Sequence, residues 1–251
     1  MKKLALKLAA GAVLVYMSYG FFLLFFESSM IYHPDSTDFQ ECQAFSDDEM
    51  IEHNDTRFYF NDEGGDLMVF YHGNAGRACD RASIMDELHD ESYMIAEYTG
   101  FGERERSPDI EKIEQDVENV ADYVEGLERD TYVVGNSLGS SPASLHASQQ
   151  EVEGLVMINP FYSAETWAWS LSPLYPEFFI TQDYNNSEHL ENVEDDTLIL
   201  YSENDRVIPP EENRRLAEEH DVERKMIEGR GHNDIFMSQA FQTELQQFTS
   251  R

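Results

Sequence analysis

Short apolar runs alternate with longer amphipathic stretches along most of the chain. After the turn signal at residues 61–66, such runs occupy 67–71, 93–98, 131–134, 154–159, 197–201 and 222–227. Continuous apolar runs of this length are typical of strands buried on both faces of a parallel sheet. Residues 28–65 are polar and acidic, and they are predicted to be irregular.

One stretch between these runs predicts an amphipathic helix. In residues 107–127, apolar side chains recur every three or four positions, at Ile110, Ile113, Val117, Val120 and Val124. Ser107 is the expected N-cap and Pro108 the expected first helical residue. Alternating strands and helices predict one doubly wound α/β domain with a mostly parallel sheet, whose ligands bind at the carboxyl ends of the strands.

The N-terminus has the pattern of a membrane anchor. Three lysines within the first seven residues precede an uncharged run at residues 8–26. The run is about long enough to cross a bilayer as a helix, and the positive-inside rule places the rest of the chain on the extracytoplasmic side, periplasmic or extracellular. We therefore expect an uncleaved signal anchor at residues 1–27 and a folded domain at residues 28–251. Cleavage near residues 18–20 and a buried core helix are the alternatives.

The charge of the chain excludes one class of partner. The sequence has 17 Lys and Arg against 50 Asp and Glu, a formal net charge of −33, so it has little means to neutralise a run of phosphates. Nucleic acid is therefore not an expected partner. A saline habitat, where counterions screen the surface, explains this acidity as well as a merely acidic soluble surface does.

The sequence has two cysteines, Cys42 and Cys79. They could pair in an exported domain, and the sequence leaves open whether they do. Neither has a second thiol or a histidine at zinc-site spacing, so no metal site is expected.

The strongest chemical signal is a serine on a glycine-flanked turn. Gly135-Asn136-Ser137-Leu138-Gly139 follows the apolar run at 131–134 and precedes a stretch that can be helical. A nucleophile on a tight strand-to-helix turn has strained backbone angles, and Gly135 and Gly139 would leave room for that turn. We expect Ser137 to be a nucleophile, and a structural corner that contains a serine is the alternative.

A serine nucleophile needs a base, and the base needs an orienting carboxylate. His232 stands in a loop after the run at 222–227, and Asp205 follows the run at 197–201. The order Ser, Asp, His is the one expected for this fold. Glu203 and Asp196, which lie near the same run, are alternative acids.

The tetrahedral intermediate of such a reaction also needs backbone N–H donors. Residues 71–78, YHGNAGRA, follow an apolar run and contain small residues that let the backbone approach a substrate. The N–H groups of Asn74 and Leu138 are the expected oxyanion donors. The chain lacks both common Gly-rich phosphate-binding motifs, so this loop is not expected to bind phosphate.

Four separated motifs together resemble a known superfamily. They are HGNAG at 72–76, GNSLGS at 135–140, YSENDRVIPPE at 201–211 and GRGHNDIF at 229–236. The chain resembles the α/β-hydrolase superfamily and, more narrowly, its small serine hydrolases with an N-terminal membrane anchor, a group that includes depalmitoylating thioesterases. The resemblance implies a triad of Ser137, Asp205 and His232, oxyanion donors at Asn74 and Leu138, and no cofactor.

Residues 160–196 occupy the place where such enzymes carry a cap. The segment is short, so a large lid domain is not expected. It is rich in aromatic residues, namely Phe161, Tyr162, Trp167, Trp169, Tyr175, Phe178 and Phe179. Most of them are expected to pack in the core, and some to line an acyl site.

These features predict a membrane-anchored serine hydrolase that cleaves a carboxylic ester or thioester through an acyl-enzyme. The expected substrate is a small acyl ester or a lipid-like molecule. A peptidase or amidase with the same triad is one alternative, and a non-catalytic binding module tethered to the membrane is another. The sequence leaves the oligomeric state open.

Overall fold

The computed structural model describes residues 2–88, 92–171 and 180–251. In this part of the chain, an eight-stranded sheet has the strand order β10-β9-β8-β7-β4-β6-β3-β2. The expected apolar runs form β4 (Leu67–Tyr71), β6 (Ser92–Glu97), β7 (Thr131–Asn136), β8 (Gly154–Ile158), β9 (Thr197–Ser202) and β10 (Glu223–Ile227). These strands pair in parallel, so the predicted doubly wound, mostly parallel sheet is confirmed.

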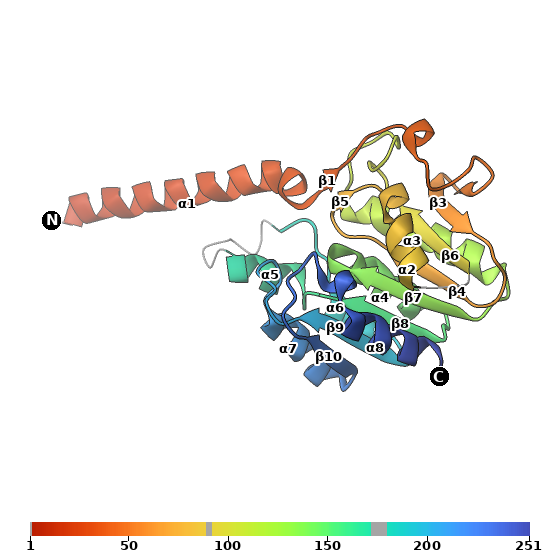
Figure 1. Cartoon of the computed structure of the whole chain (residues 1–251). Helices are drawn as coiled ribbons and strands as arrows, with labels where there is room; N and C mark the ends of the chain where they lie inside the picture. Colours follow the sequence, from red (N-terminus) through yellow and green to blue (C-terminus); the bar gives the residue numbers. More distant parts are fainter. Residues whose placement is uncertain (1, 89–91, 172–179) are drawn as a thin grey trace.

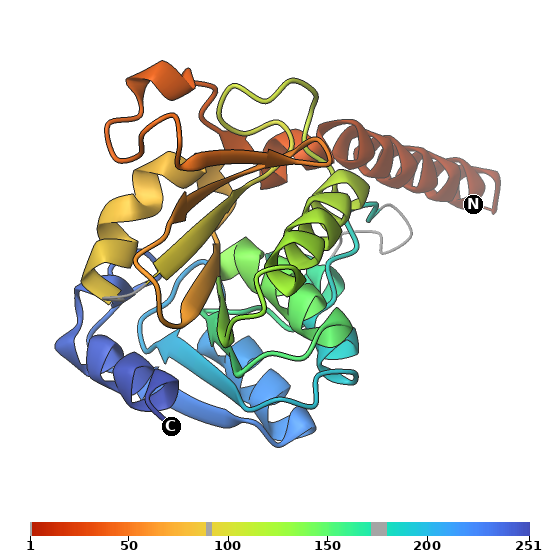
Figure 2. The same cartoon turned by 90° about the vertical axis from the view of Figure 1, so that its right-hand side faces the viewer.

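Helices cover both faces of the sheet, as Figure 2 shows with the green helices on one side and the yellow and dark blue helices on the other. One face carries α3 (Ile110–Glu125), α4 (Ser140–Gln149), α6 (Asn186–Leu190) and α7 (Pro210–His220), and the other carries α2 (Ala82–Leu88) and α8 (Gln239–Thr249). Along β4, Leu67, Val69 and Tyr71 belong to the first core, whereas Met68 and Phe70 belong to the second. Successive side chains of a strand point to opposite faces, so a strand that is apolar throughout needs both helical layers to exclude water.

The prediction that residues 28–65 are irregular was wrong for the second half of this segment. β2 (Met50–His53) and β3 (Thr56–Asn61) form a hairpin that extends the sheet, and β3 pairs antiparallel with β6. The turn residues Asn54 and Asp55 have φ values of 49° and 66°, a left-handed conformation that Asn and Asp tolerate. The three aromatic side chains of β3 are buried, at Phe58, Tyr59 and Phe60.

Helix α3 begins two residues later than its expected first residue. Asp109, not Ser107, is the N-cap, because its carboxylate accepts the backbone N–H of Lys112 at 3.1 Å. Pro108 therefore precedes the helix instead of opening it. The expected apolar face is confirmed, since Ile113, Val117, Val120 and Val124 are all buried.

Helix α1 (Lys2–Ile31) extends away from the sheet, and the N-terminus lies at its far end (Figure 1). It is long and apolar enough to cross a membrane, by length and composition. Its buried residues are Gly20, Leu23 and Glu27, which all lie in its second half. Most of α1 is therefore exposed, unlike a helix buried in a core.

Cys42 and Cys79 form a disulfide, with their Cα atoms 6.0 Å apart. Cys42 directly follows the short helix η1 (Phe39–Glu41), and Cys79 lies in η2 (Ala78–Arg81). The bond therefore ties the segment after α1 to the loop that follows β4.

Replacing both cysteines with alanine is expected to lower the free energy of unfolding by about 4 kcal/mol, because a cross-link between residues this far apart restricts the unfolded chain. Denaturant unfolding in oxidising buffer measures the difference. Dithiothreitol should destabilise the wild type to the level of the double variant and leave the variant unchanged. Equal stability of the two proteins without reductant would contradict this expectation.

Candidate active site

Ser137 stands on the sharp turn between β7 and α4, at the carboxyl end of β7. A 3-10 helix, η3 (Ser137–Gly139), makes the connection. Ser137 has a φ of 56°, in the left-handed region that non-glycine residues seldom adopt. A Cβ atom on Gly135 would lie 2.3 Å from the carbonyl oxygen of Gly139, and one on Gly139 would lie 2.1 Å from that of Tyr71. Glycine at position 135 therefore lets the turn and the start of α4 pack against β7, and glycine at position 139 lets the turn approach the end of β4.

Three side chains from three strand ends meet in one hydrogen-bonded chain. His232 Nε2 lies 2.9 Å from Ser137 Oγ, and His232 Nδ1 lies 2.6 Å from Asp205 Oδ2. A carboxylate only accepts hydrogen bonds, so in the neutral imidazole Nδ1 carries the proton and Nε2 accepts the serine hydroxyl. Only 1% of the Asp205 side chain and 10% of the His232 side chain are exposed. The arrangement can remove a proton from Ser137 while the carboxylate orients the ring.

The alternative acids lie elsewhere. Glu203 is exposed, and its carboxylate accepts the backbone N–H of Gly229 at 2.9 Å. Asp196 precedes β9, whereas Asp205 follows it, so the two lie toward opposite ends of this strand. The other carboxylate oxygen of Asp205 accepts the N–H groups of Val207 and Ile208, at 2.7 and 2.9 Å. These bonds fix the carboxylate in its loop.

The loop after β4 lies beside Ser137. Asn74 lines the same hollow as Ser137 and His232. Its side-chain Nδ2 donates to the carbonyl of Ile31 at 2.6 Å, and its carbonyl accepts the N–H of His33 at 2.8 Å. The end of α1 therefore holds this loop in place, a connection that no sequence signal indicated. Leu138 stands at the start of η3, where backbone N–H groups lack partners within the helix.

A family model described as serine hydrolase matches residues 103–243, more than half of the chain. The chain belongs to the serine hydrolase family. The matched range contains Ser137, Asp205 and His232. The protein is therefore a hydrolase, as the sequence predicted.

Solved structures show the same fold at low sequence identity. An esterase from Pyrococcus furiosus has a TM-score of 0.67 at 14% identity, over 88% of this chain and 97% of that chain. Est1E from Butyrivibrio proteoclasticus, solved with ferulic acid bound, has a TM-score of 0.66 at 16% identity, over 80% of this chain and 99% of that chain. A meta-cleavage product hydrolase from Pseudomonas fluorescens has a TM-score of 0.63 at 16% identity, over 82% and 98%. The predicted α/β-hydrolase fold is confirmed.

A buried asparagine in this serine hydrolase joins the loops that carry His232 and Asp205. Asn159 follows β8, and its Nδ2 donates to the carbonyl of His232 at 3.2 Å. Its Oδ1 accepts the N–H of Ser202 at 2.7 Å, at the end of β9. The sequence analysis did not single out Asn159. Its position after a predicted strand could have indicated that it lies near the loops with Asp205 and His232.

Between β8 and β9, the described residues of this serine hydrolase form two helices. They are α5 (Ala164–Leu171) and α6 (Asn186–Leu190). Phe161 is buried, and Trp167 stacks against it with ring centroids 6.1 Å apart. Tyr162 packs under the guanidinium of Arg215. The remaining aromatic residues singled out in the sequence are Trp169, whose side chain is not described, and Tyr175, Phe178 and Phe179, which lie outside the described residues.

Two buried titratable groups lie close together, His72 within the loop at residues 71–78 and Glu97 beside it. His72 Nε2 is 3.8 Å from Glu97 Oε1, and neither side chain is exposed. Burial lowers the pKa of His72 to about 3, so the ring is uncharged at neutral pH. Burial also raises the pKa of Glu97 to about 7, although the N–H of Ala78 donates to both of its carboxylate oxygens. The two groups therefore do not form an ion pair at neutral pH.

Glu97 is expected to make the serine hydrolase less stable as the pH rises. Its folded pKa of about 7 exceeds the ordinary value of 4.5, so the folded state holds the proton more tightly. The resulting stabilisation is complete below pH 4.5 and is lost as the pH rises through 7. From pH 5 to pH 8, the wild type should lose about 2–3 kcal/mol more unfolding free energy than Glu97→Gln does.

Denaturant unfolding of the full-length chain at several pH values measures this difference. Glu105→Gln, at an exposed position, is the matched control and should follow the wild type. Parallel curves for wild type and Glu97→Gln would show that Glu97 is already ionised across this range.

Proposed function

We propose that this hydrolase cleaves a carboxylic ester or thioester through an acyl-enzyme on Ser137. The observation that carries the proposal is the hydrogen-bonded chain from Ser137 Oγ to His232 and on to Asp205, with distances of 2.9 and 2.6 Å. This chain supplies a nucleophile, a base and an orienting carboxylate within contact of one another. The strained φ of Ser137 supports the same role, because backbone strain is common at functional sites.

The reaction follows from these positions. His232 Nε2 takes the proton of Ser137 while Oγ attacks the carbonyl carbon of the substrate. The N–H groups of Asn74 and Leu138 stabilise the oxyanion of the tetrahedral intermediate. His232 then gives its proton to the departing alcohol or thiol as the C–O or C–S bond breaks. His232 then takes a proton from a water molecule, whose oxygen attacks the acyl-enzyme. The bond between the acyl carbon and Ser137 Oγ breaks, Oγ receives the proton back from His232, and the acid leaves. Each step uses side chains, backbone and water.

We also propose that α1 anchors the enzyme in a membrane, with the catalytic domain outside the cytoplasm. Three lysines precede the apolar run, and this charge distribution favours a cytoplasmic N-terminus. The disulfide between Cys42 and Cys79 supports an oxidising compartment for the domain.

The test uses the purified full-length chain in detergent. A fluorophosphonate probe reports an activated serine, and an ester, a thioester and an amide that share one acyl group report the bond cleaved. We expect labelling, with hydrolysis of the ester and thioester much faster than that of the amide. Equal or faster turnover of the amide would make the enzyme a peptidase or amidase. A folded protein that is neither labelled nor active on any of the three would overturn the proposal.

A further inference from the structure

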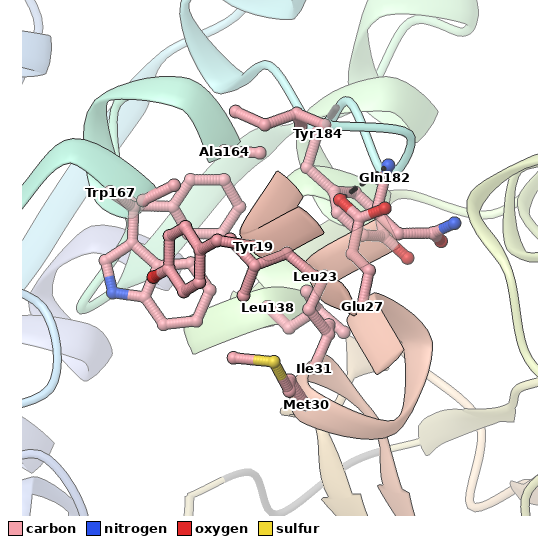
Figure 3. Close-up of a pocket in the computed structure, with 13 residues that line it drawn as sticks. Tyr19, Leu23, Glu27, Met30, Ile31, Leu138, Ala164, Trp167, Gln182 and Tyr184 are labelled. Atoms are coloured by element: carbon pink, nitrogen blue, oxygen red, sulfur yellow. Dashed lines mark hydrogen bonds between the residues drawn. The ribbon is translucent and has the colours of Figure 1, made fainter. Parts of the chain in front are cut away.

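A mostly apolar cavity lies where α1 meets the cap, and Figure 3 shows the side chains around it. Its walls come from the last turns of α1, from α5, from residues 180–184 and from Leu138. The cavity thus joins segments that are far apart in the sequence. The hydrogen bonds between Glu27 and the backbone N–H of Thr181, at 3.0 and 3.1 Å, span 154 positions.

One face of α1 builds its side of the cavity. Tyr19, Leu23, Glu27 and Ile31 follow one another at intervals of four residues, so they lie along one side of the helix. All four line the cavity. Leu23 is 4% exposed, whereas Phe25, on another side of the helix, is 82% exposed. The helix therefore turns a defined stripe toward the enzyme and leaves the rest of its apolar surface uncovered.

The main polar groups of the cavity already have partners. The Glu27 carboxylate accepts hydrogen bonds from the N–H and hydroxyl of Thr181. The Gln182 Oε1 atom accepts the hydroxyl of Tyr32 at 2.6 Å and the N–H of Ile110 at 2.9 Å. A polar ligand would have to compete with these bonds, whereas an apolar chain would not. The cavity is therefore suited to an apolar occupant.

The cavity also lies next to Ser137. The side chain of Leu138 lines the cavity, and Leu138 directly follows the serine. Trp167 lines the cavity as well, and its Nε1 donates to the carbonyl of Val207 at 3.0 Å. Val207 lines the hollow that contains Ser137 and His232. The walls of two neighbouring spaces thus meet at Leu138 and at the contact between Trp167 and Val207, and one space contains the reactive serine while the other is mostly apolar.

We propose that this cavity binds the acyl chain of the substrate, with the membrane helix α1 as one wall, and that the substrate is a long-chain ester embedded in the bilayer. The inference rests on the proposed function, since it needs an acyl group bound to Ser137. The source of the chain follows from α1 itself. Val13, Leu14 and Val15, farther toward the N-terminus, are 61–68% exposed and apolar. A chain that lies along this surface in the bilayer can enter the cavity without exposing its apolar surface to water.

The experiment narrows the cavity and measures chain-length preference. Full-length wild type, Leu23→Trp and Phe25→Trp are assayed in mixed micelles with p-nitrophenyl acetate, butyrate, octanoate and dodecanoate. The wild type should prefer the longer esters. Leu23→Trp should lower kcat/KM for dodecanoate by about tenfold or more, because the indole fills space that the chain needs. Its kcat/KM for acetate should fall much less, since acetate leaves the cavity empty, so the ratio of the dodecanoate to the acetate value is the readout. Phe25→Trp, on the exposed side of α1, should match the wild type throughout.

A second variant approaches the cavity from the opposite wall. Ala168→Phe, in α5, should reduce the dodecanoate rate selectively even if Leu23→Trp disturbs the packing of α1. Three results would overturn the inference. They are an unchanged chain-length profile in both variants, a preference of the wild type for acetate, and equal losses of kcat/KM on every ester in both variants. Acetate hydrolysis that depends on Ser137 would leave the proposed function intact in each of these cases. Absence of both hydrolysis and fluorophosphonate labelling in the wild type would instead remove the proposed function.

Discussion

Replacing Ser137 with alanine is expected to lower kcat for ester hydrolysis by at least about 10⁴-fold and to abolish fluorophosphonate labelling. Alanine removes the only atom at this position that can form the acyl-enzyme. The remaining site could at most bind the ester and orient a water molecule. Methyl and hydroxymethyl side chains are similar in size, so the turn at Gly135 and Gly139 should be preserved. Initial rates with a long-chain p-nitrophenyl ester, measured on the full-length chain, give the result.

The matched control is Ser141→Ala. Ser141 lies one turn farther along the same segment, is buried, and has a hydroxyl without a hydrogen-bond partner in the described part of the chain. This variant should keep wild-type activity within a few-fold and should still be labelled. If Ser137→Ala kept more than about a hundredth of the wild-type rate, a different nucleophile would carry the reaction.

Most of the sheet could be predicted from the sequence because its strands are buried on both faces. Such strands form continuous apolar runs that stand out from the acidic surroundings, as β4 and β8 do. The β2–β3 hairpin gave no such signal. Glu52, Asp55 and Arg57 interrupt its apolar residues, and its pairing with β6 depends on contacts far along the chain.

The start of α3 was missed for a local reason, since Ser107 and Asp109 are both good N-cap residues and only the hydrogen bond to Lys112 distinguishes them.

The three residues proposed to react could be picked out from the sequence because each follows a strand of a parallel sheet. Ser137 follows β7, Asp205 follows β9, and His232 follows β10, so the carboxyl ends of these strands bring the side chains together. The role of α1 could not be read in the same way. Its hydropathy indicates a membrane span, but the sequence does not show that the stripe with Leu23 and Glu27 packs against the enzyme. That packing depends on residues distant in the sequence, such as Thr181. The expected boundary at residue 27 also cuts through this stripe, so assays need the full-length chain.

Asp205→Asn is expected to lower kcat by about 10⁴-fold while leaving the fold intact. The asparagine oxygen can still accept the N–H groups of Val207 and Ile208, which now bond to Oδ1 of Asp205. Its amide nitrogen, however, would replace the carboxylate oxygen that faces Nδ1 of His232. An amide donor at this place favours the tautomer with the proton on Nε2, and such a ring cannot accept the proton of Ser137. Activity on the long-chain ester and unfolding midpoint, measured together, separate this effect from a loss of structure.

Glu203→Gln is the matched control, because it makes the same chemical change two residues away on the same loop. Glu203 is exposed and its carboxylate contacts the N–H of Gly229, which a glutamine oxygen can also accept. Its kcat should therefore stay within a few-fold of the wild-type value. If Glu203→Gln lost as much kcat as Asp205→Asn or more, the orienting role would belong to Glu203. The geometry around His232 would then have to change when substrate binds. A small effect of Asp205→Asn alone would mean that His232 keeps its orientation and its tautomer without the carboxylate.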